Sequence, residues 1–236
     1  MISVEIDTAP TGRLAIWNGC VPELETQYEY WYQTEHLFER MAIPGFQRAR
    51  RYVSVDHRYQ YLTYYETDSP DVLTSAEYLQ RVNHPAPMTT DIMRDAFTDM
   101  SRTVCQLTGL HGNMRGGYAA TLKMPQLPDN SQLTELLAAA SQRGFIATVE
   151  CWQATDCVTT ESAEARLRGG DQQIAACLII ETLHENHCRT LIEQLAEDFE
   201  LPQESTGIFR LLCDLSHSTM DSAYESAVNA SRGKAK

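Results

Sequence analysis

Residues 40–66 read RMAIPGFQRARRYVSVDHRYQYLTYYE, and this stretch decides the fold. Its Ile43-Pro44-Gly45 turn ends a helix, because proline and glycine interrupt helical periodicity. The runs 46–55 and 59–66 are rich in Tyr, Val and Thr and lie on either side of the polar Asp56-His57-Arg58. This composition predicts two strands joined as a hairpin.

The regions on both sides of this stretch extend the pattern. Residues 13–17 predict a short strand, and a helix is expected from Pro22 to about Met41. After the hairpin, helices are expected over about 69–82 and 89–101, followed by a strand over 102–110. The first part of the chain therefore runs β-α-β-β-α-β.

The second part of the chain repeats this order. Strands are expected at 118–124, 145–153, 174–183 and 208–215, and helices at 129–142 and 185–199. A polar stretch from 154 to 172 carries no assigned element. Because the two copies are offset by about a hundred residues, the chain is expected to contain an internal duplication.

The predicted fold class is α+β, with tandem ferredoxin-like repeats (β-α-β-β-α-β twice). Each four-stranded sheet carries helices on one face only and must cover its other face. We expect the two sheets to pack against each other as an intrachain dimeric α/β barrel. The expected units are repeat 1 at 1–112, repeat 2 at 113–216 and a polar tail at 217–236.

Charge and composition exclude several functional classes. The 236 residues have a net charge of −13, which disfavours nucleic acid as a partner. No apolar run is long enough to span a membrane, and no secretory leader is evident. The seven cysteines are scattered through apolar runs, which favours reduced thiols and a cytoplasmic location.

A local positive charge stands out against this acidic background. Nine of the 11 tyrosines lie between Tyr28 and Tyr78. The segment 40–58 holds five arginines and one acid: Arg40, Arg48, Arg50, Arg51, Arg58 and Asp56. Arginine forks bind carboxylate or phosphate, and tyrosines offer flat amphipathic walls, so this region could form a pocket for an aromatic or anionic molecule. The alternative is that these arginines pair with nearby acids for structural reasons.

The first helix places ionisable groups beside aromatic ones. At 100° per residue, Glu35 falls inside the arc of Leu24, Tyr28, Trp31 and Phe38, with His36 at its margin. A carboxylate desolvated among aromatic rings can act as a general acid or base, and the neighbouring histidine can share the proton transfer. The alternative is that Glu35 forms an ion pair with an arginine of the adjacent strand and only ties helix to sheet.

Two other motifs indicate a function less strongly. His184-x-x-His187-Cys188 offers three metal-competent side chains, but a structural zinc takes four ligands and no second pair has suitable spacing, so no metal site is predicted. The glycines at 109–117 lack the phosphate-loop pattern and are expected to link the repeats.

The residues 30–40 (YWYQTEHLFER), followed by Ile43-Pro44-Gly45-Phe46 and Arg50-Arg51-Tyr52, resemble the EthD-like branch of the dimeric α/β-barrel superfamily. The resemblance covers about residues 10–110. It implies that His36 is a pocket histidine with Trp31 and Glu35 beside it. Members of the wider superfamily include isomerases, polyketide cyclases, cofactor-free monooxygenases and haem enzymes. Most members are single repeats that dimerise, whereas this chain supplies both halves. Because its second half has no Trp-x-x-x-Glu-His equivalent, at most one active site per chain is expected.

These observations lead to one functional hypothesis and two alternatives. The hypothesis is an isomerase, cyclase or lyase without a cofactor that transfers protons on an aromatic or polyketide-like anion. Its catalytic residues would be Glu35 and His36, and its substrate-binding residues Trp31, Tyr32, Arg40, Arg50, Arg51, Tyr52 and Tyr65. The alternatives are a non-catalytic small-molecule binding or assembly protein, and haem-linked oxygen chemistry with a histidine as axial ligand. A homo-oligomer of such tandem-repeat chains is compatible with all three.

Overall fold

The structure, a computed structural model, describes residues 11–55, 59–129, 131–132, 134–135, 146–156 and 162–217. Its centre is a closed antiparallel barrel with the strand order β1-β3-β2-β8-β5-β7-β6-β4. The strands are β1 Gly12–Cys20, β2 Phe46–Ser54, β3 Tyr61–Thr67, β4 Phe97–His111, β5 Tyr118–Met124, β6 Ile146–Ala154, β7 Ala176–Thr182 and β8 Thr206–Ser216. The tip of the predicted hairpin, 56–58, lies outside the described residues.

The barrel differs in one respect from two sheets that only face each other. β2 pairs with β8 and β4 pairs with β6, so the two sheets are joined at both edges by hydrogen bonds. Within each half the pairing order is the same, β4-β1-β3-β2 and β8-β5-β7-β6. Edge pairing satisfies backbone groups that an open sheet would leave exposed.

Helical segments fill the connections. They are η1 Pro22–Leu24, α1 Glu25–Trp31, η2 Tyr32–His36, α2 Leu37–Met41, η3 Pro70–Thr74, α3 Ala76–Asn83, α4 Pro87–Asp95, α6 Ala163–Leu167, α7 Glu185–Asp198 and η4 Gln203–Ser205. Most of the helix predicted at 129–142 lies outside the described residues.

Two boundaries correct the sequence interpretation. The helix expected over 89–101 is α4, which begins at Pro87 and ends at Asp95, since proline is well suited to the first helical turn. β4 then begins at Phe97, because its first residues pair with the end of β1, where Phe97 lies opposite Cys20. The unassigned polar stretch 154–172 contains the short helix α6.

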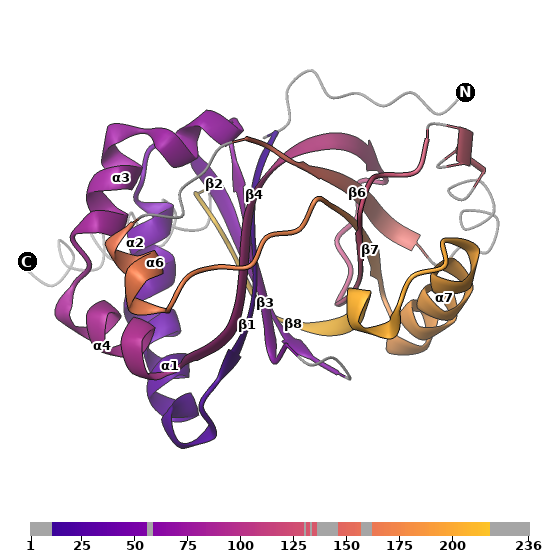
Figure 1. Cartoon of the computed structure of the whole chain (residues 1–236). Coiled ribbons are helices and arrows are strands. Elements are labelled where there is room, and N and C mark those ends of the chain that lie inside the picture. Colours follow the sequence, from indigo (N-terminus) through magenta and orange to yellow (C-terminus); the bar gives the residue numbers. More distant parts are fainter. Residues whose placement is uncertain are drawn as a thin grey trace, which may run out of the picture.

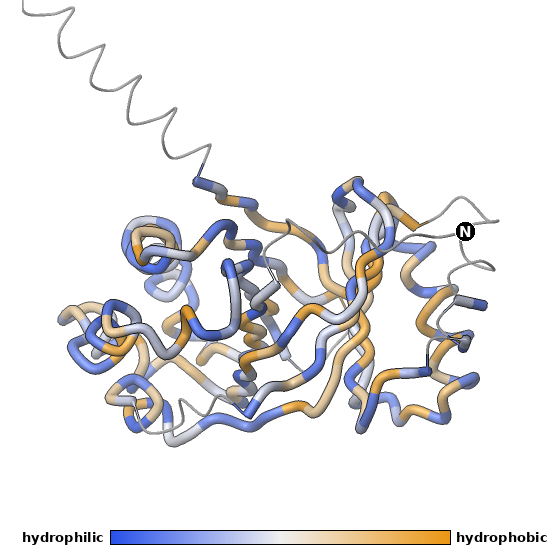
Figure 2. Tube along the Cα trace, turned by 90° about the horizontal axis from the view of Figure 1, so that it is seen from above, coloured by the Kyte–Doolittle hydropathy of each residue, from blue (hydrophilic) through white to orange (hydrophobic). Residues whose placement is uncertain are grey.

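The helices cover opposite sides of the barrel. Figure 1 shows α1–α4 and α6 on one side and α7 on the other. α6 follows β6 in sequence but contacts α3 and α4, so the second half of the chain contributes to the helical layer of the first. In Figure 2, hydrophobic and hydrophilic residues alternate along these helices, as expected for helices with one face against a sheet.

The core has three parts. One lies inside the barrel and includes Trp17, Tyr64, Trp152 and Phe209. The other two lie between the outer face of the sheet and the helices of each half.

Two further observations concern the state of the cysteines and the length of the helices. The described cysteines, Cys20, Cys105, Cys151, Cys177, Cys188 and Cys213, are free thiols, and Cys157 lies outside the described residues. None of the helices in the described part of the chain combines the length and apolar character needed to cross a bilayer.

Candidate functional site

The first helical run changes its geometry in the middle. In η2 the Leu37 backbone N–H donates to the Tyr32 carbonyl, five residues earlier, which is the π-helical pattern. A π turn holds one residue more than an α turn, so the buried face moves along by one position. Tyr28, Trp31 and Tyr32 face inward before it, and His36 and Arg40 face inward after it.

This extra residue corrects the arc assigned from a uniform 100° rotation. Phe38, expected on the buried arc, is 45% exposed. Glu35, expected inside the arc, is half-buried, whereas His36, expected at its margin, is 3% exposed.

His36 is a buried, neutral imidazole. Its ring packs against the Trp31 indole, with ring centroids 4.1 Å apart and an angle of 34° between the planes. Burial lowers the pKa of His36 well below its ordinary value, and the nearby charges of Arg40, Arg168 and Arg51 lower it further. Its Nδ1 has no hydrogen-bond partner among the described residues. The ring therefore has a nitrogen available to a ligand.

A small cavity of about 20 Å³ lies beside His36, between the outer face of the sheet and the helices. Tyr32, His36 and Arg40 line it from the first helical run, Tyr65 lines it from β3, and Met93 from α4. This volume accommodates about one water-sized group.

Two further polar atoms at this cavity lack partners. Arg40 Nη1 and the Tyr65 hydroxyl are both buried and, within the described ranges, accept or donate no hydrogen bond. Arg40 Nη2 donates to both carboxylate oxygens of Glu164, with 2.6 Å to Oε2. Burial acts to lower the pKa of Arg40, but the Glu164 carboxylate outweighs it and the pKa is raised. Arg40 is thus a charged donor with one nitrogen engaged and one available.

The second half of the chain completes the cavity wall through Glu164 and Arg168. Arg168 Nη2 donates to both oxygens of Asp171, at 3.0 and 2.9 Å, and its Nη1 lies 3.2 Å from Met93 Sδ. The sequence interpretation missed these residues because it left 154–172 unassigned. A signal was present: Ser162 precedes the helix-favouring run AEARLR, and its hydroxyl caps α6 by accepting from the Ala165 N–H at 3.1 Å.

Glu35 contacts the Thr89 hydroxyl, not the arginine of the adjacent strand that the structural alternative required. The Thr89 hydroxyl donates to Glu35 Oε1 at 3.0 Å, and the Thr89 oxygen in turn accepts from Trp31 Nε1 at 3.0 Å. Thr89 on α4 therefore ties Glu35 to the indole against which His36 packs.

Neighbouring arginines on β2 point to opposite faces of the sheet, as strand alternation predicts. Arg51 lies on the helix side, where it binds Glu29 at 2.7 and 2.9 Å and lies 4.2 Å from the centroid of the Tyr32 ring. Arg50 points into the barrel and pairs with Glu181, which also accepts from Tyr52 at 3.2 Å. Arg50 and Tyr52, predicted to bind substrate, are thus separated from the His36 cavity by the sheet.

Inside the barrel these side chains belong to an ion-pair network. Glu150 accepts from Arg13 and Arg115, each at 2.8 Å, and Arg115 also binds Glu66 at 2.8 Å. Burial raises the pKa of Glu150, but Arg13 and Arg115 outweigh burial and lower it to about 2. Since breaking such pairs is costly, we interpret the network as structural.

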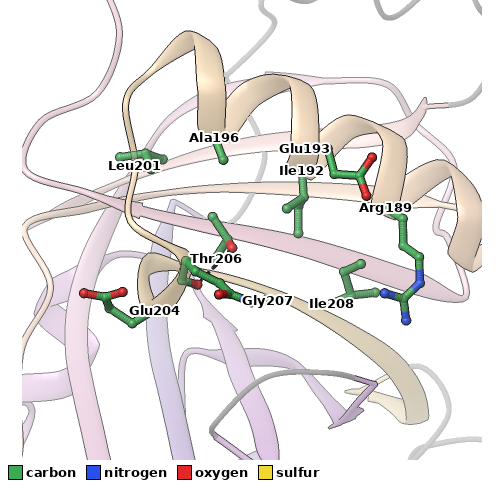
Figure 3. A pocket seen from close by; sticks show the side chains of 10 residues that line it. Arg189, Ile192, Glu193, Ala196, Leu201, Glu204, Thr206, Gly207 and Ile208 are labelled. Atoms are coloured by element: carbon green, nitrogen blue, oxygen red, sulfur yellow. Dashed lines mark hydrogen bonds between the residues drawn. The ribbon is translucent and has the colours of Figure 1, made fainter.

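A larger cleft of about 770 Å³ lies between α7 and the start of β8. Figure 3 shows Arg189, Ile192 and Glu193 on the helix, facing Gly207 and Ile208 of the strand. At the end of β7, the Thr182 hydroxyl lies 3.2 Å from Cys188 Sγ on α7. The described residues contain no group of three metal-ligating side chains placed to hold an ion.

Comparisons with known proteins identify the fold. No family model matches the chain, and no curated protein matches its sequence. An anthrone oxidase-like protein superposes with a TM-score of 0.54 and 11% identity, covering 91% of this chain and 95% of that one. A mutant chlorite dismutase from Candidatus Nitrospira defluvii in complex with cyanide superposes with a TM-score of 0.51 and 10% identity, covering 87% of this chain and 92% of that one. A candidate monooxygenase from Fusobacterium nucleatum superposes with a TM-score of 0.50 and 8% identity, covering 88% of this chain and 95% of that one.

All three neighbours are dimeric α/β-barrel proteins, and this chain shares their fold. At these identities the likeness concerns architecture alone.

Haem, which the sequence resemblance allowed, fits neither the His36 cavity nor the cleft beside α7. His36 is packed against Trp31 beside a cavity of about 20 Å³, far too small for a macrocycle. The larger cleft is lined by Arg, Ile, Glu, Ala, Leu, Gln, Thr and Gly, none of which is a usual axial ligand.

Proposed function

We propose that the chain is a cofactor-independent enzyme of isomerase, cyclase or lyase type that transfers a proton on a small molecule bound at the His36 cavity. The observation that carries this proposal is the available Nδ1 of a buried, neutral histidine. A neutral imidazole can accept a proton, and a dry site strengthens the electrostatic interactions of the charges formed.

The proposed roles follow from the geometry. His36 takes the proton, while Arg40 Nη1 and the Tyr65 hydroxyl donate to a substrate oxygen on which negative charge develops. Glu35, half-exposed and held by Thr89, exchanges the proton carried by His36 with solvent, and His36 then gives a proton back to the substrate. Tyr32 lines the cavity and Trp31 packs against the His36 ring, while Arg51 holds the Tyr32 ring in place.

The cavity limits how a substrate binds. About 20 Å³ receives one oxygen atom of a ligand, and the remainder of an aromatic or polyketide-like molecule has to displace part of the wall. Met93 and Met100 on that wall are unbranched and adaptable, which suits such a displacement.

The finer assignment of the fold is also part of this proposal. We take residues 1–112 and 113–216 as two ferredoxin-like repeats of an EthD-like protein, with 217–236 as a tail. The shared strand order of the two halves supports the duplication. The pocket position of His36 supports the EthD-like assignment.

Deuterium incorporation tests the proposal directly. Phenols and β-dicarbonyl compounds with an exchangeable C–H are incubated with the protein in D₂O and followed by NMR. We expect catalysed exchange for at least one compound, lost in His36→Gln and weakened in Tyr65→Phe. His184→Gln, at an exposed histidine, is the matched control and should exchange normally.

A non-catalytic binding protein is the second candidate, favoured by the small cavity and by the pairing of Arg40, Arg51 and Arg168 with carboxylates. In that case these compounds would raise the melting temperature without any catalysed exchange, which would refute the enzyme proposal.

A further inference from the structure

Glu164 reaches the His36 cavity from the other half of the chain. It lies on α6, between β6 and β7, and its side chain is 6% exposed. Both of its oxygens accept from Nη2 of Arg40, and its Oε2 lies 3.8 Å from Nη1 of Arg168. One carboxylate therefore faces two of the guanidinium groups on the cavity wall.

This pairing changes what Arg40 can bind. A buried guanidinium without a counterion attracts an anion strongly, because little solvent screens the interaction. Beside Glu164 the charge of Arg40 is neutralised, while the N–H groups of Nη1 have no acceptor among the described residues. The nearby Arg168 and Arg51 are likewise paired, with Asp171 and Glu29, and Arg102, which also lines the cavity, donates to the Tyr78 hydroxyl at 2.5 Å. Burying a ligand carboxylate here costs its desolvation and adds repulsion from Glu164.

We propose that Glu164 is the specificity-determining residue of the cavity: it selects an uncharged ligand that presents a hydrogen-bond-accepting oxygen and rejects a carboxylate of the same shape. This inference rests on the proposed site and replaces the anionic substrate suggested by the arginine-rich sequence with a neutral one. Arg40 Nη1 and the Tyr65 hydroxyl supply the two donors for that oxygen. Any negative charge arises during the reaction and is absent from the bound ligand.

Formamide and formate test this specificity, because they have the same number of heavy atoms and nearly the same shape but differ in charge. Methyl-¹³C methionine labelling places reporters on Met93 and Met100, which line the cavity. Titration at neutral pH should shift these signals saturably with formamide and at least about tenfold more weakly with formate. Formate binding as tightly as formamide would overturn the inference.

Glu164→Gln removes the charge and keeps the shape. We expect it to change the ratio of the two affinities by about tenfold or more in favour of formate, since two guanidinium groups then face the cavity without that carboxylate. Glu164→Asp, which keeps the charge, should retain the preference for formamide. Glu197→Gln, at an exposed carboxylate of α7, should leave the ratio unchanged. An unchanged ratio in Glu164→Gln would contradict the proposal.

The comparison of formamide with formate in the natural chain tests the inference even where Glu164→Gln fails to fold. Failure of the proton-transfer proposal can also be distinguished from failure of this specificity inference. His36→Gln should keep the preference for formamide, because that preference depends on Glu164 and Arg40. A protein that discriminates the two probes but catalyses no exchange would retain this inference and lose the proposed function.

Discussion

The two faces of β2 carry buried arginines with different surroundings. Inside the barrel, Glu150 accepts from Arg13, Arg115 and Trp152, and Glu181 accepts from Arg50, Tyr52, Tyr64 and the Gly116 N–H. On the helix side, His36 Nδ1, Arg40 Nη1 and the Tyr65 hydroxyl remain without partners within the described ranges. Trp17 Nε1 inside the barrel also lacks a hydrogen-bond partner among the described residues, so the difference is that the three atoms on the helix side belong to residues that line one cavity. Unused donors and acceptors that converge on a cavity mark a place for a ligand.

The largest expected effect follows from breaking the inner network. Glu150→Gln would leave the buried Arg13 and the partly exposed Arg115 beside an uncharged amide. Removing one partner of a buried ion pair costs about 3–5 kcal/mol, so we expect a loss of that size in the free energy of unfolding measured with urea. Glu197→Gln at the surface serves as the control, with a change within about 0.5 kcal/mol. A loss below about 1 kcal/mol for Glu150→Gln would mean that the network is not structural.

The two clusters should also separate by pH. The pKa of His36 is lower in the folded state than its ordinary 6.5, so the unfolded chain takes up its proton first as the pH falls. Stability should therefore decline from about pH 7 toward pH 5, and His36→Gln should flatten this part of the profile.

Glu150 affects stability at lower pH than His36 does. Its folded-state pKa is about 2, against an ordinary 4.5, so its contribution is complete above pH 4.5 and is lost as the pH falls toward 2. Urea midpoints across pH 2–7 should show that Glu150→Gln flattens only the acid end. A single decline affected equally by both substitutions would mean that the clusters do not titrate separately.

Adjacent tyrosines on β3 give a finer test. Tyr65→Phe removes a buried hydroxyl without a described partner, so we expect the protein to keep its stability or to gain about 1 kcal/mol. Tyr64→Phe, the matched variant on the inner face, loses hydrogen bonds to Glu181 at 3.1 Å and Arg50 at 3.2 Å and should be destabilised by about 1–2 kcal/mol. Thermal unfolding checks both, and the opposite ranking would reverse the assignment of the two faces.

The smallest effect is expected at Phe38. Because the π turn places it outward, Phe38→Ser should change stability by no more than about 0.5 kcal/mol. Leu37→Ala, at the neighbouring buried position, should cost about 2–4 kcal/mol. Similar losses at both positions would argue for an uninterrupted α-helix.

The sequence determined much of the architecture because alternation and turn residues are local signals. The strand predicted over 118–124 has these bounds in the structure, and the opposite orientations of Arg50 and Arg51 follow from strand periodicity. The choice between Glu35 and His36 as the buried group did not follow, because it depends on one extra residue in a π turn. A uniform helical periodicity of 100° per residue does not reveal where a π turn changes the angle between successive side chains.

The part of the site that the sequence did not predict comes from a segment distant in sequence. Ser162 and the following helix formers could have indicated α6, but nothing in residues 163–168 says that this helix packs on the other half of the chain. The pairing of Arg40 with Glu164 joins positions 124 residues apart. Side-chain pairings over such distances follow from the tertiary fold.

Closure of the barrel has a consequence for fragments of the protein. β8 covers the edge of β2, and β6 covers the edge of β4, so each half shields hydrogen-bonding groups of the other. A fragment ending in the connection between β4 and β5 would expose both edges, and open edges template association with other chains. Such a fragment should aggregate or self-pair, whereas a single backbone nick at residues 112–117 of the intact protein cuts through no strand.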